Sequence, residues 1–103
     1  MSWNIKFADS VEKWLNKLTH QQLKSVAKEM RLLELSGHEL KLPHSKALGK
    51  RLFELRERKF GYRLYYTFDQ EQSIVLLYAG NKSSQRIDIK KAREIINNIR
   101  SSK

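Results

Sequence analysis

The sequence predicts an α+β fold, in which two N-terminal helices and a C-terminal helix pack on a small antiparallel sheet. Apolar residues recur at helical spacing near both ends of the chain. Between residues 51 and 79, three runs alternate apolar and polar residues, as strands do. The connections between these runs are short, which is typical of antiparallel neighbours. The expected element order is β-α-α-β-β-β-α, with the helices on one sheet face.

The chain begins with an expected strand and an expected helix. Residues 3–7, WNIKF, alternate in polarity and predict a short strand. Asp9 or Ser10 is suited to cap the helix that follows. The spacing of the next apolar residues indicates one buried helix face, formed by Val11, Trp14, Leu15 and Leu18.

A second helix is expected immediately after the first. Thr19 and Gln22 have the spacing of a capping box, which predicts a helix start. Gly37 is placed to end this helix. Residues 38–50 are then expected to form a loop, because a proline and a glycine interrupt them.

The second half of the chain predicts a meander and a final helix. Residues 51–58, 62–69 and 73–79 are the expected strands, joined by KFG and QEQ. Residues 88–100 carry isoleucines and an alanine at helical spacing, which predicts the third helix.

Composition limits the possible functions. The chain has 103 residues, so we expect one domain spanning residues 1–103. It has no cysteine, which excludes disulfides, thiolate metal sites and a cysteine nucleophile. No apolar run approaches the roughly 20 residues that span a bilayer, so we expect a cytoplasmic protein that does not enter a membrane. The net charge of +10 favours a polyanionic partner such as nucleic acid.

The alternation of side chains places several charged residues on one sheet face. Glu54, Arg56 and Arg58 share one face of their strand, and Arg63 and Tyr65 take the same face of the next. We expect this face to be open to solvent, opposite the helices. Arginines and a tyrosine on an open sheet face favour RNA binding, through phosphate contacts and base stacking. The alternative is a solvated face whose cations protect a sheet edge.

Three short motifs resemble those of a known family. They are LFELR at residues 52–56, YRLYY at residues 62–66 and GNK at residues 80–82. In this order and spacing they resemble the RelE/ParE superfamily of bacterial toxin–antitoxin toxins, and most of all its HigB-like, phage-derived branch. The resemblance covers roughly residues 42–96, and the predicted element order agrees with a RelE-like fold.

The resemblance implies a small basic mRNA interferase that acts in the ribosomal A site without metal or cofactor. By position, Arg56 and Arg63 match residues that hold the scissile phosphate, and Lys82 matches the basic residue after the last strand. Glu54 stands where RelE-like toxins have a catalytic lysine, and Asp88 lies near the place of the family's catalytic tyrosine. The expected catalytic residues are therefore Arg56, Arg63, Lys82 and Glu54. The expected RNA-binding residues are Lys50, Arg51, Arg58, Lys59, Tyr65 and Gln85.

The general base is open at this point. Glu54 is one candidate, and it is equally suited to be the salt-bridge partner of Arg56 or Arg63. His44 is the other group that titrates near neutral pH. The three histidines are scattered and show no metal-ligand spacing, so no metal site is expected.

The leading functional prediction is a ribosome-dependent mRNA endonuclease toxin. A cognate antitoxin with a helix-turn-helix is the expected protein partner, by analogy with the family. One alternative is a ParE-like gyrase inhibitor. The other is a non-catalytic RNA-binding module, which the missing lysine and tyrosine favour.

Overall fold

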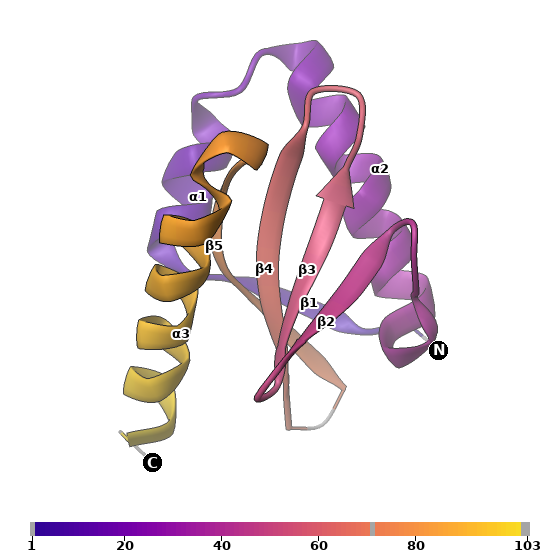
Figure 1. Ribbon diagram of the computed structural model, residues 1–103. Helices are drawn as coiled ribbons and strands as arrows, with labels where there is room; N and C mark the ends of the chain where they lie inside the picture. The colour runs from indigo at the N-terminus through magenta and orange to yellow at the C-terminus, as the bar shows by residue number, and fades with distance from the viewer. Residues whose placement is uncertain (1, 71, 102–103) are drawn as a thin grey trace.

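The computed structural model describes residues 2–70 and 72–101 and confirms the α+β class (Figure 1). Glu71, in the predicted QEQ connection, and both ends of the expected domain lie outside the described residues. The helices and strands are β1 (Asn4–Phe7), α1 (Asp9–Asn16), α2 (His20–Ser36), η1 (Gly37–Glu39), β2 (Ser45–Gly49), β3 (Leu52–Glu57), β4 (Tyr62–Asp69), β5 (Ser73–Asn81), η2 (Lys82–Ser84) and α3 (Gln85–Ser101).

The strands form one five-stranded sheet in the order β1-β5-β4-β3-β2. The meander of β3, β4 and β5 is antiparallel, as expected. β1, however, lies parallel to β5, so the sheet is mixed rather than antiparallel throughout. A parallel pair requires a long connection between its strands, and here most of the fold lies between them.

β2 occupies a segment that the sequence predicts to be a loop. The strand is short and ends at Gly49, whose φ is +89°. It forms because β3 pairs with it, and because the Ser45 hydroxyl lies 2.5 Å from the Tyr66 hydroxyl on β4. β3 follows after a two-residue turn, but the proline and glycine within residues 38–50 made a loop the expected structure, and Tyr66 is 21 residues away from Ser45.

The N-terminal helices begin and end largely where the sequence predicts. The Thr19 side chain accepts a hydrogen bond from the Gln22 N–H, and the Gln22 side chain accepts one from the Thr19 N–H. α2 ends at Gly37, with a φ of +53°. A side chain could not fit there, since a Cβ atom would lie 1.9 Å from the Trp3 indole nitrogen.

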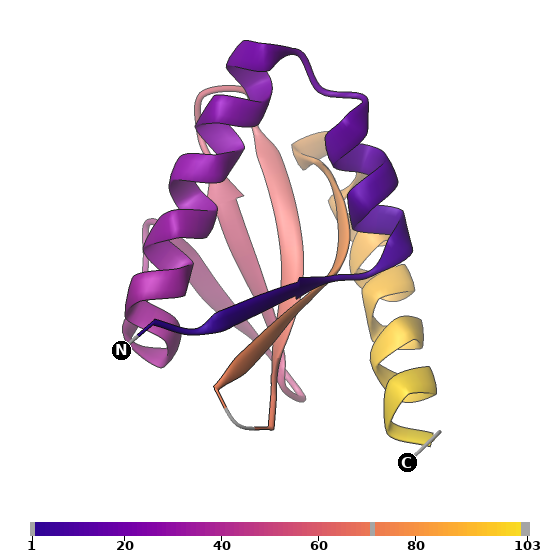
Figure 2. The same cartoon turned by 180° about the vertical axis from the view of Figure 1, so that it is seen from behind.

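The helices lie on both faces of the sheet, so the expectation that all three share one face is wrong. α1 and α2 cover one face, seen from the front in Figure 2, and α3 lies along the β5 side of the other face in Figure 1. The larger core lies under α1 and α2 and includes Leu33, Leu55, Leu64, Tyr66 and Ile74. The smaller core lies under α3 and contains Leu52, Tyr65, Leu77, Ala92 and Ile96.

α3 begins at Gln85, three residues before the predicted start. The short helix η2 precedes it, and the Asn81 side chain accepts hydrogen bonds from the backbone N–H groups of Ser83 and Ser84. At the other end of the sheet, the Arg93 guanidinium donates to the carbonyls of Leu48 and Gly49. These contacts hold α3 across the face that carries the candidate site.

Candidate functional site

Arg56 and Arg63 lie directly opposite each other on β3 and β4. Both side chains extend from the sheet face that α3 partly covers, and their exposed fractions are 25% and 14%. Directly opposed residues of antiparallel strands have Cβ atoms about 4.5–5.5 Å apart. The two strands therefore bring two permanent cations together, and like charges at that spacing need a counter-ion.

Glu54 supplies that counter-ion. Its side chain is fully buried, and one carboxylate oxygen accepts from Arg56 Nε at 2.9 Å and from Arg63 Nη1 at 3.3 Å. The second oxygen accepts from the side-chain amide of Gln85, at the start of α3. A buried charge is tolerated when it is paired and hydrogen-bonded in this way. Of the two roles predicted for Glu54, the geometry matches the salt-bridge partner.

Tyr65 has the predicted strand parity, yet it and Glu54 are fully buried and not open to solvent. The prediction of exposure is wrong because α3 packs over this part of the sheet. Burial, followed by the negative charge of Glu54, raises the pKa of the Tyr65 hydroxyl well above its ordinary value. The hydroxyl lies beside the Glu54 carboxylate as a neutral donor, and no described residue forms a hydrogen bond with Arg63 Nε.

The first turn of α3 fits closely against β5. Asp88 is buried, and its carboxylate accepts a hydrogen bond from the Ser84 hydroxyl. Gly80 leaves the space for this carboxylate, since a Cβ atom at that position would lie 1.9 Å from it. Asp88 therefore holds α3 over the candidate site, in the region where the sequence resemblance places a catalytic tyrosine.

Lys82 lies at the same end of the sheet, as the register of the strands and a backbone hydrogen bond show. Arg63 is opposite Gly80 in the register of β4 and β5, and Lys82 lies two residues further along. The Lys82 N–H donates to the Gly61 carbonyl at 2.9 Å, which joins η2 to the turn between β3 and β4. That turn also carries Arg58 and Lys59, both exposed. Five of the predicted cationic residues thus gather at one end of the sheet.

The sequence of residues 13–100 matches the model of the phage-derived Gp49-like protein family. The chain belongs to the Gp49-like family. No curated protein sequence matches it. Its fold is similar to that of a mutant of the toxin RelE from E. coli in the free state, with a TM-score of 0.71 and 16% identity, over 92% of this chain and 99% of that one.

Two toxin–antitoxin complexes also contain similar chains. One is the RelB–RelE complex of Mycobacterium tuberculosis, with a TM-score of 0.62 and 23% identity, over 80% of this chain and 100% of that one. The other is the archaeal RelE–RelB complex from Pyrococcus horikoshii, with a TM-score of 0.58 and 19% identity, over 80% of this chain and 97% of that one. The Gp49-like chain thus has the RelE-like fold that the sequence predicted, and the matching family is a phage-derived one.

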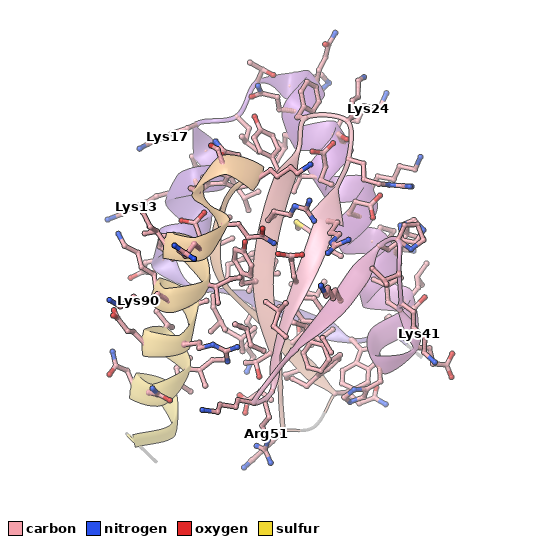
Figure 3. The ribbon with its side chains drawn as sticks, viewed as in Figure 1. Lys13, Lys17, Lys24, Lys41, Arg51 and Lys90 are labelled. Carbon is pink, nitrogen blue, oxygen red and sulfur yellow. The ribbon has the colours of Figure 1, made fainter. Side chains whose placement is uncertain are left out.

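Two predicted site residues of the Gp49-like chain lie apart from the arginine pair. Lys50 and Arg51 form the turn between β2 and β3, and Figure 3 shows Arg51 at the lower end of the sheet. Arg51 and Arg56 are five residue steps apart along the strand, and at about 3.3 Å per step this is roughly 17 Å. The structure therefore does not bring Lys50 and Arg51 to the candidate site.

His44 is not placed as a base for chemistry at the arginine pair. Its Nδ1 atom lies 3.0 Å from the Glu29 carboxylate of α2, while its carbonyl accepts from the Arg56 N–H. The imidazole is thus engaged with a helix on the other face of the sheet. Over the described residues, no group of three potential metal ligands occurs, and no helix is long and apolar enough to cross a membrane.

Glu57, which is not among the residues predicted from the sequence, is buried at the end of β3. Its carboxylate accepts hydrogen bonds from Ser25 of α2 and from three backbone N–H groups of the β3–β4 turn. Strand parity contained the signal, because Glu57 takes the same face as Phe53 and Leu55. An acidic residue on the apolar face of a strand indicates a buried carboxylate with specific partners.

Proposed function

We propose that this Gp49-like protein is the toxin of a type II toxin–antitoxin system and cleaves mRNA in the ribosomal A site. The observation that carries the proposal is the Arg56–Arg63 pair on a partly covered sheet face. Two guanidiniums that share one carboxylate have the geometry to bridge a phosphate, which offers more oxygens and more charge than the carboxylate does. We also propose that this toxin belongs to the HigB-like branch.

The proposed reaction needs no metal ion. The ribose 2′-hydroxyl attacks the adjacent phosphorus, and the P–O5′ bond breaks. The products are a 2′,3′-cyclic phosphate and a 5′-hydroxyl, and the 2′ proton is released as the 5′ oxygen takes one up. The protein orients the RNA backbone for in-line attack and stabilises the charge that develops on the phosphate.

The described residues divide these tasks. Arg56 and Arg63 hold the scissile phosphate, and Lys82 adds positive charge from the end of β5. Glu54 orients the two guanidiniums, because hydrogen bonds from three side chains already occupy its carboxylate. Gln85 acts through Glu54 and not through direct contact with RNA.

An antitoxin is the proposed protein partner. A chain of net charge +10 that cleaves RNA requires a regulator, and an acidic or wrapping segment would neutralise that charge. The M. tuberculosis and P. horikoshii structures are toxin–antitoxin complexes, which supports a partner of this kind. We include in the proposal a helix-turn-helix in the antitoxin and a cytoplasmic site of action.

The proposal is tested by inducing the protein with and without the neighbouring gene while RNA 5′ ends are mapped. The parent should stop translation and produce new 5′ ends within codons, and the neighbouring gene should suppress both effects. Arg63→Ala should reduce cleavage about 10²–10³-fold, the usual effect of losing one group that stabilises transition-state charge. Lys17→Ala, directly after α1, removes the same charge elsewhere and should remain toxic.

Each alternative has its own outcome in this experiment. DNA damage with intact mRNA would identify a ParE-like gyrase inhibitor and refute the nuclease. Ribosome binding without new 5′ ends would identify a non-catalytic RNA-binding module. Full toxicity of both Arg56→Ala and Arg63→Ala would show that the arginine pair is not the site.

A further inference from the structure

The five cationic residues at the end of the sheet that holds the β3–β4 turn fall into two groups. Arg56 and Arg63 share the carboxylate of Glu54. Arg58, Lys59 and Lys82 are exposed and form no ion pair with any described residue. The first group is therefore neutralised in part within the fold, and the second group lacks an internal counter-ion.

Glu57 could have neutralised the second group, but its hydrogen bonds go to neutral groups. The carboxylate accepts from the Ser25 hydroxyl at 2.6 Å and from the backbone N–H groups of Lys59 at 2.9 Å, Phe60 at 3.1 Å and Tyr62 at 3.2 Å. Only 2% of Glu57 is exposed. Its negative charge thus fixes the backbone of the turn and leaves the ammonium and guanidinium groups available.

Further contacts hold the β3–β4 turn in one conformation. Gly61 has a φ of +79°, and its carbonyl accepts from the Lys82 N–H. The Phe60 ring stacks on Tyr62, and Lys59 Nζ lies 5.5 Å from the centre of the Phe60 ring. A surface element that is ordered before binding loses less conformational entropy when a ligand arrives.

We propose that the β3–β4 turn is a separate phosphate-docking subsite, and that Glu57 is its positioning residue. Arg58 and Lys59 bind phosphates of the RNA strand in the ground state, next to the phosphate held by Arg56 and Arg63, while Lys82 lies between the two positions. RNA as the ligand rests on the proposed function, but the subsite does not require that the bound strand be cleaved. Its effect should appear in RNA affinity and KM, whereas the arginine pair should govern kcat.

The decisive measurement is the salt dependence of binding to single-stranded RNA with 2′-O-methyl groups throughout, which removes the attacking hydroxyl. Each phosphate contact contributes about 0.7 to the slope of log K against log salt on a single strand. The double variant R58A/K59A should therefore reduce the slope by about 1.4. The control K13A/K17A, in the last turn of α1 and directly after it, at the left of Figure 3, removes the same charge and should leave the slope unchanged.

Glu57→Gln tests the positioning role. The amide retains one acceptor oxygen but presents an NH₂ group to backbone N–H donors, so the turn should lose its fixed conformation. This variant should weaken RNA binding in the same direction as R58A/K59A, with every cation still present. Ser25→Ala removes only the contact to α2, so it should lower the melting temperature slightly and preserve the slope. If Glu57→Gln and Ser25→Ala had equal effects on the slope, the positioning role of Glu57 would be overturned.

The outcomes separate this inference from the proposed function. If the parent protein cleaves RNA and R58A/K59A has the same slope and KM as the parent, the docking subsite is overturned and the nuclease remains supported. A parent that binds the methylated RNA without cleaving normal RNA, with the slope reduced in R58A/K59A, would refute the nuclease and leave the subsite intact. Equal losses in R58A/K59A and K13A/K17A would show that only net charge matters and would overturn the subsite.

Discussion

The two faces of the sheet are built differently. Under α1 and α2, the sheet is apolar and aromatic, with residues such as Leu64 and Tyr66 in one continuous core. Under α3, the apolar contacts form a smaller cluster, and Glu54 is buried beside them among polar side chains. The α1/α2 face therefore supplies most of the apolar packing, with the buried carboxylate of Glu57 only at the end of β3, whereas the α3 face accommodates Glu54 and the arginine pair together.

On the α3 face, hydrogen bonds help to attach the helix to the sheet, whereas apolar packing attaches the helices on the other face. Gln85 donates to Glu54 of β3, and the Asp88 carboxylate, which accepts from Ser84 of η2, packs against Gly80 of β5, so the first turn of α3 meets the sheet through polar side chains. Further along the helix, Ala92 and Ile96 pack on the sheet. Such contacts depend on angle as well as distance, which suits a helix that must hold guanidinium groups in a defined orientation.

The largest expected effect is on the apolar face. Leu33 is fully buried in α2, so Leu33→Ala should lower the free energy of unfolding by about 2–5 kcal/mol, through lost apolar contacts and the cavity left behind. Urea denaturation measures this change. RNA cleavage per folded molecule should stay near that of the parent, because the arginine pair lies on the other face. If the folded variant lost cleavage, the two faces would not be separable.

A smaller effect is expected from Glu54→Gln on the polar face. The amide keeps the shape of the side chain but removes the shared negative charge, so stability should fall by about 1–3 kcal/mol. Cleavage should fall about tenfold through misplaced guanidiniums, whereas loss of a general base would cost about 10²–10⁴-fold. Single-turnover kinetics separates the two results, with Glu12→Gln on the surface of α1 as the control.

A loss of cleavage near the upper end of that range, in a variant that still folds, would overturn the positioning role of Glu54. It would instead support the proton-transfer role that the sequence left open. No change in cleavage would show that Arg56 and Arg63 are held adequately by other contacts.

The sequence predicted the apolar face better than the polar face. Capping at Thr19 and the helical spacing from Val11 to Leu18 are local signals, and both helices form accordingly. Strand parity also predicted that Arg56 and Arg63 share a face, since parity depends only on the strands themselves. These features required no knowledge of distant partners.

The features that the sequence did not predict depend on contacts between distant segments. The burial of Glu54 and Tyr65 follows from where α3 packs, and that helix lies far along the chain. One signal was present: residues 74–79, IVLLYA, form an unbroken apolar run, which is typical of a strand covered on both faces. Lys50 and Arg51 were grouped with the site by charge, although they stand at the opposite end of β3.

The smallest expected effect comes from Gln85→Ala, which tests the polar attachment of α3 alone. Loss of the amide donor to Glu54 should cost about 0.5–1.5 kcal/mol, the usual net contribution of one hydrogen bond. Amide hydrogen exchange should quicken in the first turn of α3 and stay unchanged in α2, because the apolar core there is not altered. Asn98→Ala, on the exposed surface of α3, is the matched control. If Gln85→Ala destabilised α2 as much as Leu33→Ala does, the two faces would unfold as one unit, and the polar face could not adjust to RNA independently.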